Sequence, residues 1–167
     1  GSPRHGLLQQ TLRRSRLRVE IATEDALGIL FRCEEQGQAL GPRDLRRALV
    51  SYAQAHPLEA WWVTRTLNRK GLARLAEEAW TLSASGRERA SRVIRTHRLW
   101  ENWLWHHLNL PADHVHDSAM RLEHVTDDLM HRQLVEETEG DETDPHGRSI
   151  PPAMDSGRPG ETTEPPD

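Results

Sequence analysis

Apolar residues in the first half of the chain recur with the spacing of about three to four residues that is typical of helices. The first such helix is expected to begin at Thr23, because Thr is a favoured N-cap and the two acids that follow suit the positive end of the helix dipole. A short second helix is expected over 43–50, after the Gly41-Pro42 turn. A third is expected over 58–70, ending at Gly71.

Two short strand-like runs follow these helices, at 72–75 and 80–83, with a turn over 76–79 between them. Three short helices followed by a hairpin form the element order of a winged helix-turn-helix, in which the hairpin is the wing. The pattern therefore predicts a winged helix-turn-helix over residues 21–86.

A long helical pattern over 87–108 and a second one over 113–134 follow, separated by Pro111. No predicted sheet remains to cover their apolar stripes, so we expect a helical pair that also packs against a second copy. The residues expected at these contacts are Trp100, Leu104, Leu122, Val125 and Leu129. The predicted fold class is mainly α, with the winged helix followed by a helical dimerisation unit over 87–151.

The two ends of the chain differ in composition from the middle. Residues 1–3 are interpreted as a cloning remnant, and 4–20 combine leucines with arginines, which indicates a basic amphipathic or juxtamembrane helix, or else a solvated helical arm. Residues 152–167 are rich in proline, glycine and acids and are expected to be disordered. No apolar run approaches the roughly 20 residues that span a bilayer. The single cysteine, Cys33, excludes an intramolecular disulfide and fits a reducing compartment.

The histidines of the second half are the candidate chemistry. His97 and Glu101 are four residues apart, so both project from one face of the predicted helix. A second stripe falls on the next helix at His116, Met120, Glu123 and His124. Imidazole, carboxylate and thioether donors suit Fe²⁺, Mn²⁺, Co²⁺ or Zn²⁺. Spacing alone leaves the alternatives of a helix-surface hydrogen bond for the His–Glu pair and core packing for Met120.

Several motifs, in one order, resemble the DtxR/MntR family of iron- and manganese-dependent repressors. They are TEDALGILFRCEEQG at 23–37, VTRTLNRKGLA at 63–73, THRLWENW at 96–103, VHDSAMRLEHVTD at 115–127 and DPHGRSIP at 144–151. The resemblance covers about residues 22–151. It implies a winged helix joined to a metal-binding dimerisation domain.

The resemblance also implies which residues bind metal. His97, Glu101 and His116 match the family's ancillary site, and Asp25, Met120, Glu123 and His124 match its primary site. Met120 stands where relatives have cysteine or glutamate, and Gly28 stands where manganese-type members add a carboxylate. A thioether is a softer ligand than those carboxylates, which leaves Fe²⁺, Zn²⁺ and Co²⁺ open beside Mn²⁺.

The predicted third helix corresponds to the family's recognition helix and offers possible DNA contacts at Thr64, Arg65, Asn68, Arg69 and Lys70. Two features weigh against DNA binding. Trp61 and Trp62 replace small polar residues near the start of that helix, and Glu77 and Glu78 place negative charge on the wing. DNA is therefore the less favoured partner at this stage.

The opening PRHGLLQQTLRRSRLR resembles the segment after the last membrane span of manganese, zinc or iron ABC permeases, some of which carry a DtxR-like domain. We therefore expect a metal-sensing regulatory domain at the cytoplasmic face of the inner membrane, dimeric, with the membrane-spanning permease and an ABC ATPase subunit as partners. The alternative is a stand-alone repressor that binds operator DNA as a dimer. A third possibility is a degenerate dimer used only for assembly. No catalysis is expected, since no GxxxxGK[ST] loop is present.

Overall fold

A computed structural model describes residues 3–153, with side chains from residue 13 onward. In chain order the elements are α1 (Pro3–Glu35), α2 (Pro42–Ser51), α3 (Pro57–Arg69), β1 (Ala73–Ala76), β2 (Ala79–Leu82), α4 (Ala84–Leu108), α5 (Ala112–Glu123) and α6 (Asp128–Glu137). The expected mainly helical class is confirmed. None of the helices in the described range is long and apolar enough to cross a membrane. Residues 1–2 and 154–167, which hold most of the expected remnant and disordered tail, lie outside that range.

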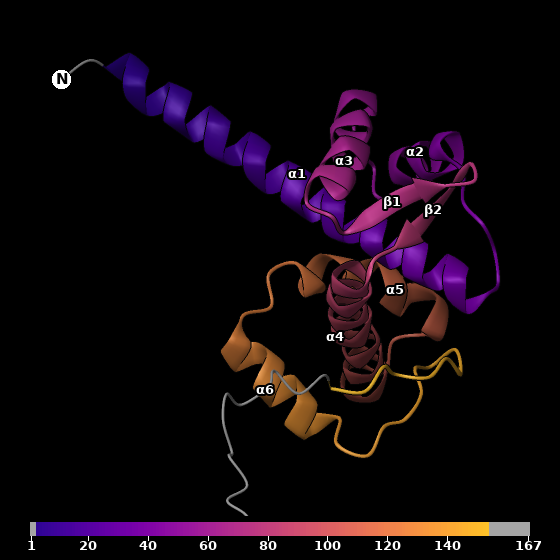
Figure 1. Ribbon diagram of the computed structural model, residues 1–167. Coiled ribbons are helices and arrows are strands. Elements are labelled where there is room, and N and C mark those ends of the chain that lie inside the picture. The colour runs from indigo at the N-terminus through magenta and orange to yellow at the C-terminus, as the bar shows by residue number, and fades with distance from the viewer. Residues whose placement is uncertain (1–2, 154–167) are drawn as a thin grey trace, which may run out of the picture.

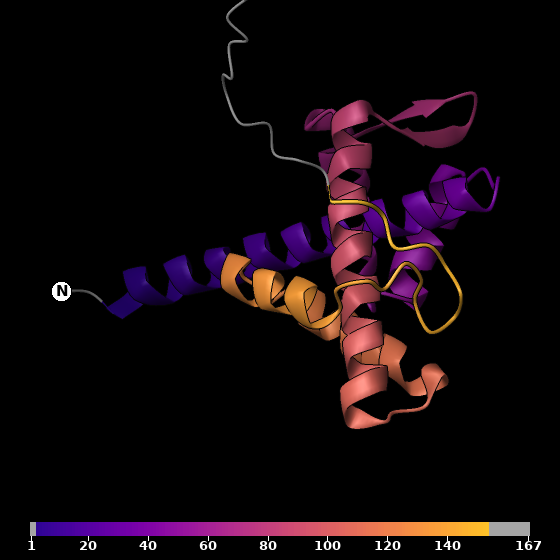
Figure 2. The ribbon, with the colours of Figure 1, turned by 90° about the horizontal axis from the view of Figure 1, so that it is seen from below.

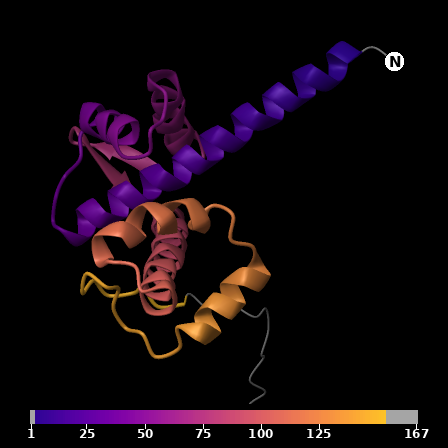
Figure 3. The same ribbon diagram turned by 180° about the vertical axis from the view of Figure 1, so that it is seen from behind.

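Helix α1 lies between two layers of the molecule. Figure 1 shows α2, α3 and the two-stranded sheet on one side of α1, with α4, α5 and α6 on the other, and Figure 3 shows the same division from behind. Seen from below, α4 crosses α1, and the hairpin lies at one end of α4 (Figure 2). The N-terminal part of α1 projects beyond both layers. Both layers therefore use the C-terminal half of α1 as a common wall.

The predicted helix start at Thr23 is wrong, because α1 runs without a break from Pro3 to Glu35. Thr23 is buried in the middle of the helix, and its hydroxyl donates to the carbonyl oxygen of Val19 at 2.5 Å. A threonine hydroxyl can bond to the preceding turn of a helix as well as cap a new one. The residue that resembled an N-cap therefore satisfies its hydroxyl inside the helix.

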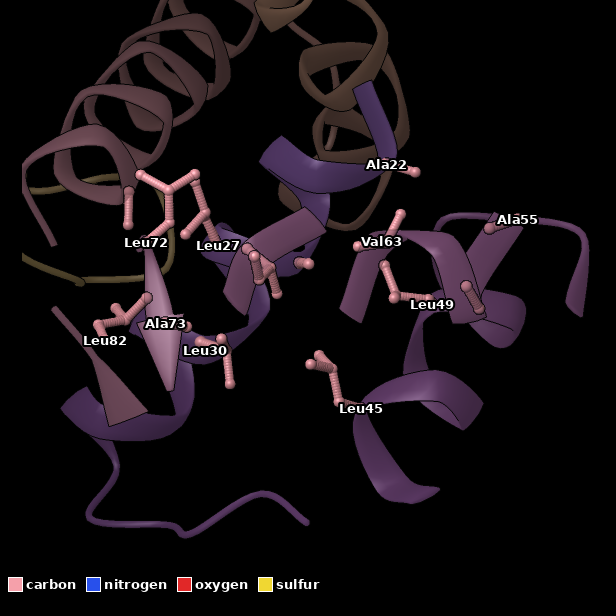
Figure 4. Close-up of a cluster of buried hydrophobic side chains, with 14 residues drawn as sticks. Ala22, Leu27, Leu30, Leu45, Leu49, Ala55, Val63, Leu72, Ala73 and Leu82 are labelled. Carbon is pink, nitrogen blue, oxygen red and sulfur yellow. The ribbon is translucent and has the colours of Figure 1, made fainter. Parts of the chain in front are cut away.

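Apolar side chains of α1, α2, α3 and the hairpin form the first core, and Figure 4 shows this cluster. Its fully buried members include Leu27 of α1 together with Leu45, Leu49, Val63 and Leu67. The second and third predicted helices are confirmed as α2 and α3. His56 caps α3: its ring accepts from the Leu58 N–H, while Glu59 accepts from the His56 N–H. These bonds fix the N-terminus of α3, and the shared apolar core packs α3 against α1.

The wing is a short antiparallel hairpin shifted by one residue from the predicted strands. Ala73 pairs with Leu82 and Ala76 with Ala79. Glu77 and Glu78 form the turn, with φ of +49° and +70°. Two successive positive φ values are typical of the tight turns whose twist matches a hairpin. The carboxylates are thus held at the tip of the wing.

Helix α4 begins three residues before the predicted start. Ser83 caps it by accepting from the Gly86 N–H at 3.0 Å, and the Ser83 hydroxyl also lies 3.0 Å from the carbonyl oxygen of Leu72. Gly86 packs directly on the hairpin, since a Cβ there would lie 1.8 Å from that oxygen. The junction between the wing and α4 therefore requires glycine at position 86.

The predicted single helix over 113–134 is wrong, because α5 ends at Glu123 and α6 begins at Asp128. The hydroxyl of Thr126 donates to the carbonyl oxygen of Leu122 and accepts from the Trp100 indole N–H at 2.8 Å. Asp127 then caps α6 by accepting from the Met130 N–H. A tertiary contact to α4 thus ends one helix just before a cap begins the next.

A second core joins α4, α5 and α6. The residues expected at helix contacts divide into two groups: Trp100, Leu104 and Leu122 pack in this core, whereas Val125 and Leu129 are 66% and 58% exposed in the single copy. Ile150, which follows the 144–149 turn, also enters the core. The DPHGRSIP segment is therefore part of the same layer as α4.

We expect Gly86→Ala to lower the free energy of unfolding by more than about 2 kcal/mol, because the new methyl group meets main chain rather than a movable side chain. Urea unfolding of the metal-free protein measures this. Gly28→Ala is the matched control, since Gly28 is also helical and buried but a Cβ there has contacts of only 3.4 Å or more. Equal stability of the two variants would contradict the close approach.

Candidate metal centre

Two clusters of metal-ligating side chains lie where α1, α4 and α5 meet. The first contains His97 and Glu101 of α4 and His116 of α5. Glu101 Oε1 lies 3.1 Å from His97 Nε2 and 2.8 Å from His116 Nδ1, and these two ring nitrogens are 3.0 Å apart. His97 and Glu101 are buried. The i, i+4 spacing on α4 therefore creates an internal cluster and not a surface hydrogen bond.

The second cluster joins α1 to the end of α5. It contains Asp25, Glu123 and His124. His124 Nε2 lies 3.1 Å from Asp25 Oδ1 and 3.6 Å from Glu123 Oε1. Glu24 approaches His124 Nδ1 to 3.3 Å while its other oxygen accepts from Arg89 at 2.9 Å. Residues almost 100 positions apart in sequence thus meet at one point.

Glu123 connects the two clusters. Its Oε2 lies 2.5 Å from His97 Nδ1, while its Oε1 faces His124. The groups therefore form one continuous constellation from His116 to Asp25. A single carboxylate thus contacts a histidine of each cluster.

A pocket of roughly 550 Å³ opens onto this constellation. Asp25, His116 and Glu123 line it, and so does Met120, the remaining residue of the predicted primary site. Met120 is half-buried on the pocket wall. The seven predicted ligands therefore converge on one region, six of them within the two clusters.

Contacts between histidines and carboxylates shift the pKa values of several groups at the centre. Burial by itself lowers the pKa of His97, but hydrogen bonds to Glu101 and Glu123 outweigh it and the pKa is raised. Burial likewise opposes charge on His124, yet Asp25 and Glu24 raise the pKa of His124 to about 10. Burial acts to raise the pKa of Glu101, but His116 and His97 hold it well below its ordinary range. In each case the carboxylate–imidazole contact dominates.

The donor set fits a transition-metal ion. Four carboxylates, from Glu24, Asp25, Glu101 and Glu123, converge in a partly buried space with three imidazoles. Such a concentration of negative charge away from water is costly unless cations balance it. Histidine and carboxylate together suit Mn²⁺, Fe²⁺, Co²⁺ and Zn²⁺, and three ligands per cluster leave further positions for water or a fourth ligand.

Comparison with known proteins agrees with this geometry. Residues 83–152 match the family described as the iron dependent repressor, metal binding and dimerisation domain. The diphtheria toxin repressor of Corynebacterium jeikeium is 35% identical over 129 residues, covering 77% of this chain and 52% of that protein. A manganese-dependent transcriptional repressor in complex with manganese has a similar structure, with a TM-score of 0.69 and 30% identity over 78% of this chain and 59% of that one. The chain belongs to the DtxR/MntR family.

Other relatives of this DtxR/MntR chain differ in context. A probable metal transport system membrane protein of Chlamydia trachomatis is 38% identical over 85 residues, which is 51% of this chain and 19% of that protein. ScaR with bound Zn²⁺ has a TM-score of 0.62 and 27% identity, over 78% of this chain and 59% of that one. The chain thus spans about half the length of the repressor relative and about a fifth of the transport protein.

Three residues at the centre were missed by reasoning from the sequence. Glu24 contacts His124 directly, and His146 of the DPHGRSIP segment places Nε2 4.0 Å from Glu101 Oε1. Arg32 lines the pocket beside both clusters. The sequence marks Glu24 only as a residue suited to a helix start and His146 only as part of a motif. Their positions depend on packing between elements, which helix periodicity does not contain.

The predicted DNA-contact residues lie on α3. Arg65, Asn68, Arg69 and Lys70 are exposed, with Lys70 at the C-cap, whereas the Thr64 hydroxyl donates to the carbonyl oxygen of Trp61. Trp61 and Trp62 are also exposed, by 42% and 51%, and their rings meet edge to face. The Arg65 guanidinium lies 5.6 Å above the Trp61 ring. The outer face of α3 thus combines cationic and aromatic groups.

The metal-free protein should lose stability as pH rises from 6.5 toward about 10, because the folded state holds a proton on His124 that the unfolded chain releases. His124→Gln should flatten this dependence. The free energy of unfolding, measured by urea at several pH values in the presence of a chelator, tests the prediction. A slope that is the same in both proteins would contradict the assignment of charge to His124.

Proposed function

We propose that this chain is a divalent-metal-responsive regulatory module of the DtxR type, which acts as a homodimer and binds DNA when metal occupies its centre. The observation that carries the proposal is the Asp25–Glu123–His124 cluster, which joins α1 to α5. Because α1 is packed in the winged-helix core, this cluster couples the candidate metal ligands to α3. The proposal requires no catalysis.

The coupling follows from how the residues are distributed. A bound ion would supply a charge that the carboxylates of α1 and α5 can share. Asp25 and Glu24 would move with α1, while His97, Glu101 and Glu123 belong to the layer of α4 and α5. In a dimer, the orientation of α1 relative to that layer would set the separation of the two α3 helices, and hence their fit to successive major grooves. Metal shifts the equilibrium if it binds this orientation more tightly than others.

The metals that the ligands support are Mn²⁺, Fe²⁺, Zn²⁺ and Co²⁺. Asp25 is a hard oxygen ligand, whereas Met120 would contribute a soft thioether. Two relatives have been solved with manganese and with Zn²⁺. Asp25, Met120, Glu123 and His124 would form one site, and His97, Glu101 and His116 the other.

The comparisons and the exposed face of α3 favour DNA binding more strongly than the sequence alone does. Repressors cover 77% of the chain in comparison, whereas the membrane protein covers 51%. The cations at Arg65, Arg69 and Lys70 are available to phosphates and base edges, with Thr64 and Asn68 beside them. A metal-dependent repressor is therefore the main proposal, in place of the permease domain that the sequence alone favours.

A regulatory domain of a metal-ion permease remains the second candidate. The match to the transport system membrane protein favours it, as do the exposed arginines of α1 between residues 13 and 18. In this case the partners would be the permease and its ATPase, at the cytoplasmic face of the membrane. Metal binding without metal-dependent DNA affinity would favour this second candidate.

Glu123→Gln should weaken binding at both clusters by roughly ten- to hundred-fold, because Glu123 contacts His97 and His124. His116→Ala should weaken only the first cluster. Calorimetric titration with Mn²⁺, Co²⁺, Zn²⁺ and anaerobic Fe²⁺ measures both effects. Glu88→Gln, an exposed carboxylate on α4, is the control. Unaltered metal binding by Glu123→Gln would contradict the proposed metal centre.

Metal should increase the affinity of the dimer for a selected DNA sequence, and Arg65→Ala should reduce that affinity. Fluorescence anisotropy at several salt concentrations, with and without Mn²⁺, provides the test after selection from a random DNA library. Arg92→Ala, which removes an exposed arginine on α4, serves as the matched control. Binding that no metal strengthens would count against the repressor reading and favour the permease domain.

A further inference from the structure

Arg32 of α1 is a cation placed beside the candidate metal ligands. It is partly buried and lines the same pocket as Asp25, His116 and Glu123. The carboxylates that act on it most strongly are Glu123 and Glu101, one from each side of the constellation. Within the described residues, no acceptor lies within hydrogen-bond or ion-pair distance of its guanidinium. The charge is thus held near the centre by burial and long-range attraction rather than by a fixed contact.

Gly28 gives Arg32 the space to reach this position. A Cβ at Gly28 would lie 3.4 Å from the Arg32 Nη1 and 3.5 Å from Ile94 Cδ1. Long side chains on a helix point back toward its N-terminus, so the guanidinium lies over Gly28, one turn closer to Asp25 than its own Cα. A carboxylate at position 28 would instead occupy this space and pair with the guanidinium. Glycine at position 28 and arginine at position 32 together place a positive charge where a carboxylate at position 28 could have been a further metal ligand.

We propose that Arg32 is a built-in competing cation that lowers the affinity of the centre for metal and so sets the concentration at which the module responds. This inference rests on the proposed metal-binding function. In the metal-free protein the Arg32 charge balances the carboxylates. A divalent ion at Glu123 must overcome repulsion from that charge, or displace the guanidinium into the adjoining pocket of roughly 550 Å³.

Repulsion between a divalent ion and a fixed cation that line the same partly buried pocket is large. Coulomb's law at an effective dielectric constant near that of protein surfaces makes the effect roughly ten- to hundred-fold in affinity, after allowance for screening. Arginine is suited to this task because its guanidinium stays charged when it is partly removed from water. Arg32 therefore differs from a ligand: its removal is expected to strengthen binding.

Calorimetric titration of the whole chain with Mn²⁺ and Zn²⁺ tests the proposal. Arg32→Gln should bind roughly ten- to hundred-fold more tightly than wild type, and Arg32→Lys, which keeps a charge, should stay within about three-fold. Arg92→Gln removes the same unit of charge from an exposed position on α4 and should leave the affinity unchanged. Affinity in Arg32→Gln that equals or falls below wild type would overturn the inference.

Thermal unfolding separates this role from a structural one. Arg32→Gln should lower the unfolding temperature of the metal-free protein, because the carboxylates lose a balancing charge, while the metal-saturated protein should be lowered less. A structural role would lower both equally and would also overturn the inference. If neither wild type nor Arg32→Gln binds Mn²⁺ or Zn²⁺, the proposed metal-binding function fails and the inference fails with it. Weakened binding by Glu123→Gln, together with an affinity of Arg32→Gln that is equal to or below that of wild type, would instead reject the role of Arg32 alone.

Discussion

The convergence of four carboxylates between α1, α4 and α5 is the constraint on which the rest of the structure depends. Burial of unbalanced negative charge would separate these helices. The protein meets the constraint with His97 and His124, whose pKa values the carboxylates raise, with Arg89 on Glu24, and with Arg32. An arrangement that is stable only when balanced by cations is also one whose geometry responds to a cation. Under the proposed function, the same charges would serve both folding and metal sensing.

Helix α1 connects this balance of charges to the winged helix, because it packs in both layers. One face packs with α2 and α3 through Leu27 and Leu30, and the opposite face carries Asp25 toward α5. At its C-terminal end, Glu35 pairs with the buried Arg98 of α4 at 2.6 Å. Glu24 and Asp25 therefore connect α1 to the second layer at one position along the helix, and Glu35 connects it at another. Under the proposed function, movement of α1 at the cluster would be resisted at Glu35, which would favour rotation about that end over free sliding.

Local patterns in the sequence predicted most elements. They failed where a side chain can satisfy its hydrogen bond in two ways, or where a tertiary contact decides the local structure. Helices α2 and α3 were predictable from glycine, proline and apolar spacing. Thr23 was not, because its hydroxyl is satisfied equally by a cap or by the preceding turn. The break between α5 and α6 depends on the Trp100–Thr126 contact, which no local pattern contains. For the site, the i, i+4 pair on α4 was visible, whereas Glu24, Arg32 and His146 became relevant only when α1 and the 144–150 segment packed on it.

Because α1 is unbroken, the repressor hypothesis and the permease hypothesis both depend on the same helix. Asp25 lies on the same helix as the exposed arginines between 13 and 18, and the side chain of Arg18 reaches Glu59 of α3 at 3.5 Å. A rotation of α1 at the metal centre would therefore reorient α3 and the basic segment together. Coupling through α1 cannot distinguish a DNA partner from a transporter partner, since it would serve either. The distinction lies in the surfaces that α1 moves, namely the cationic and aromatic face of α3 and the arginines that precede it.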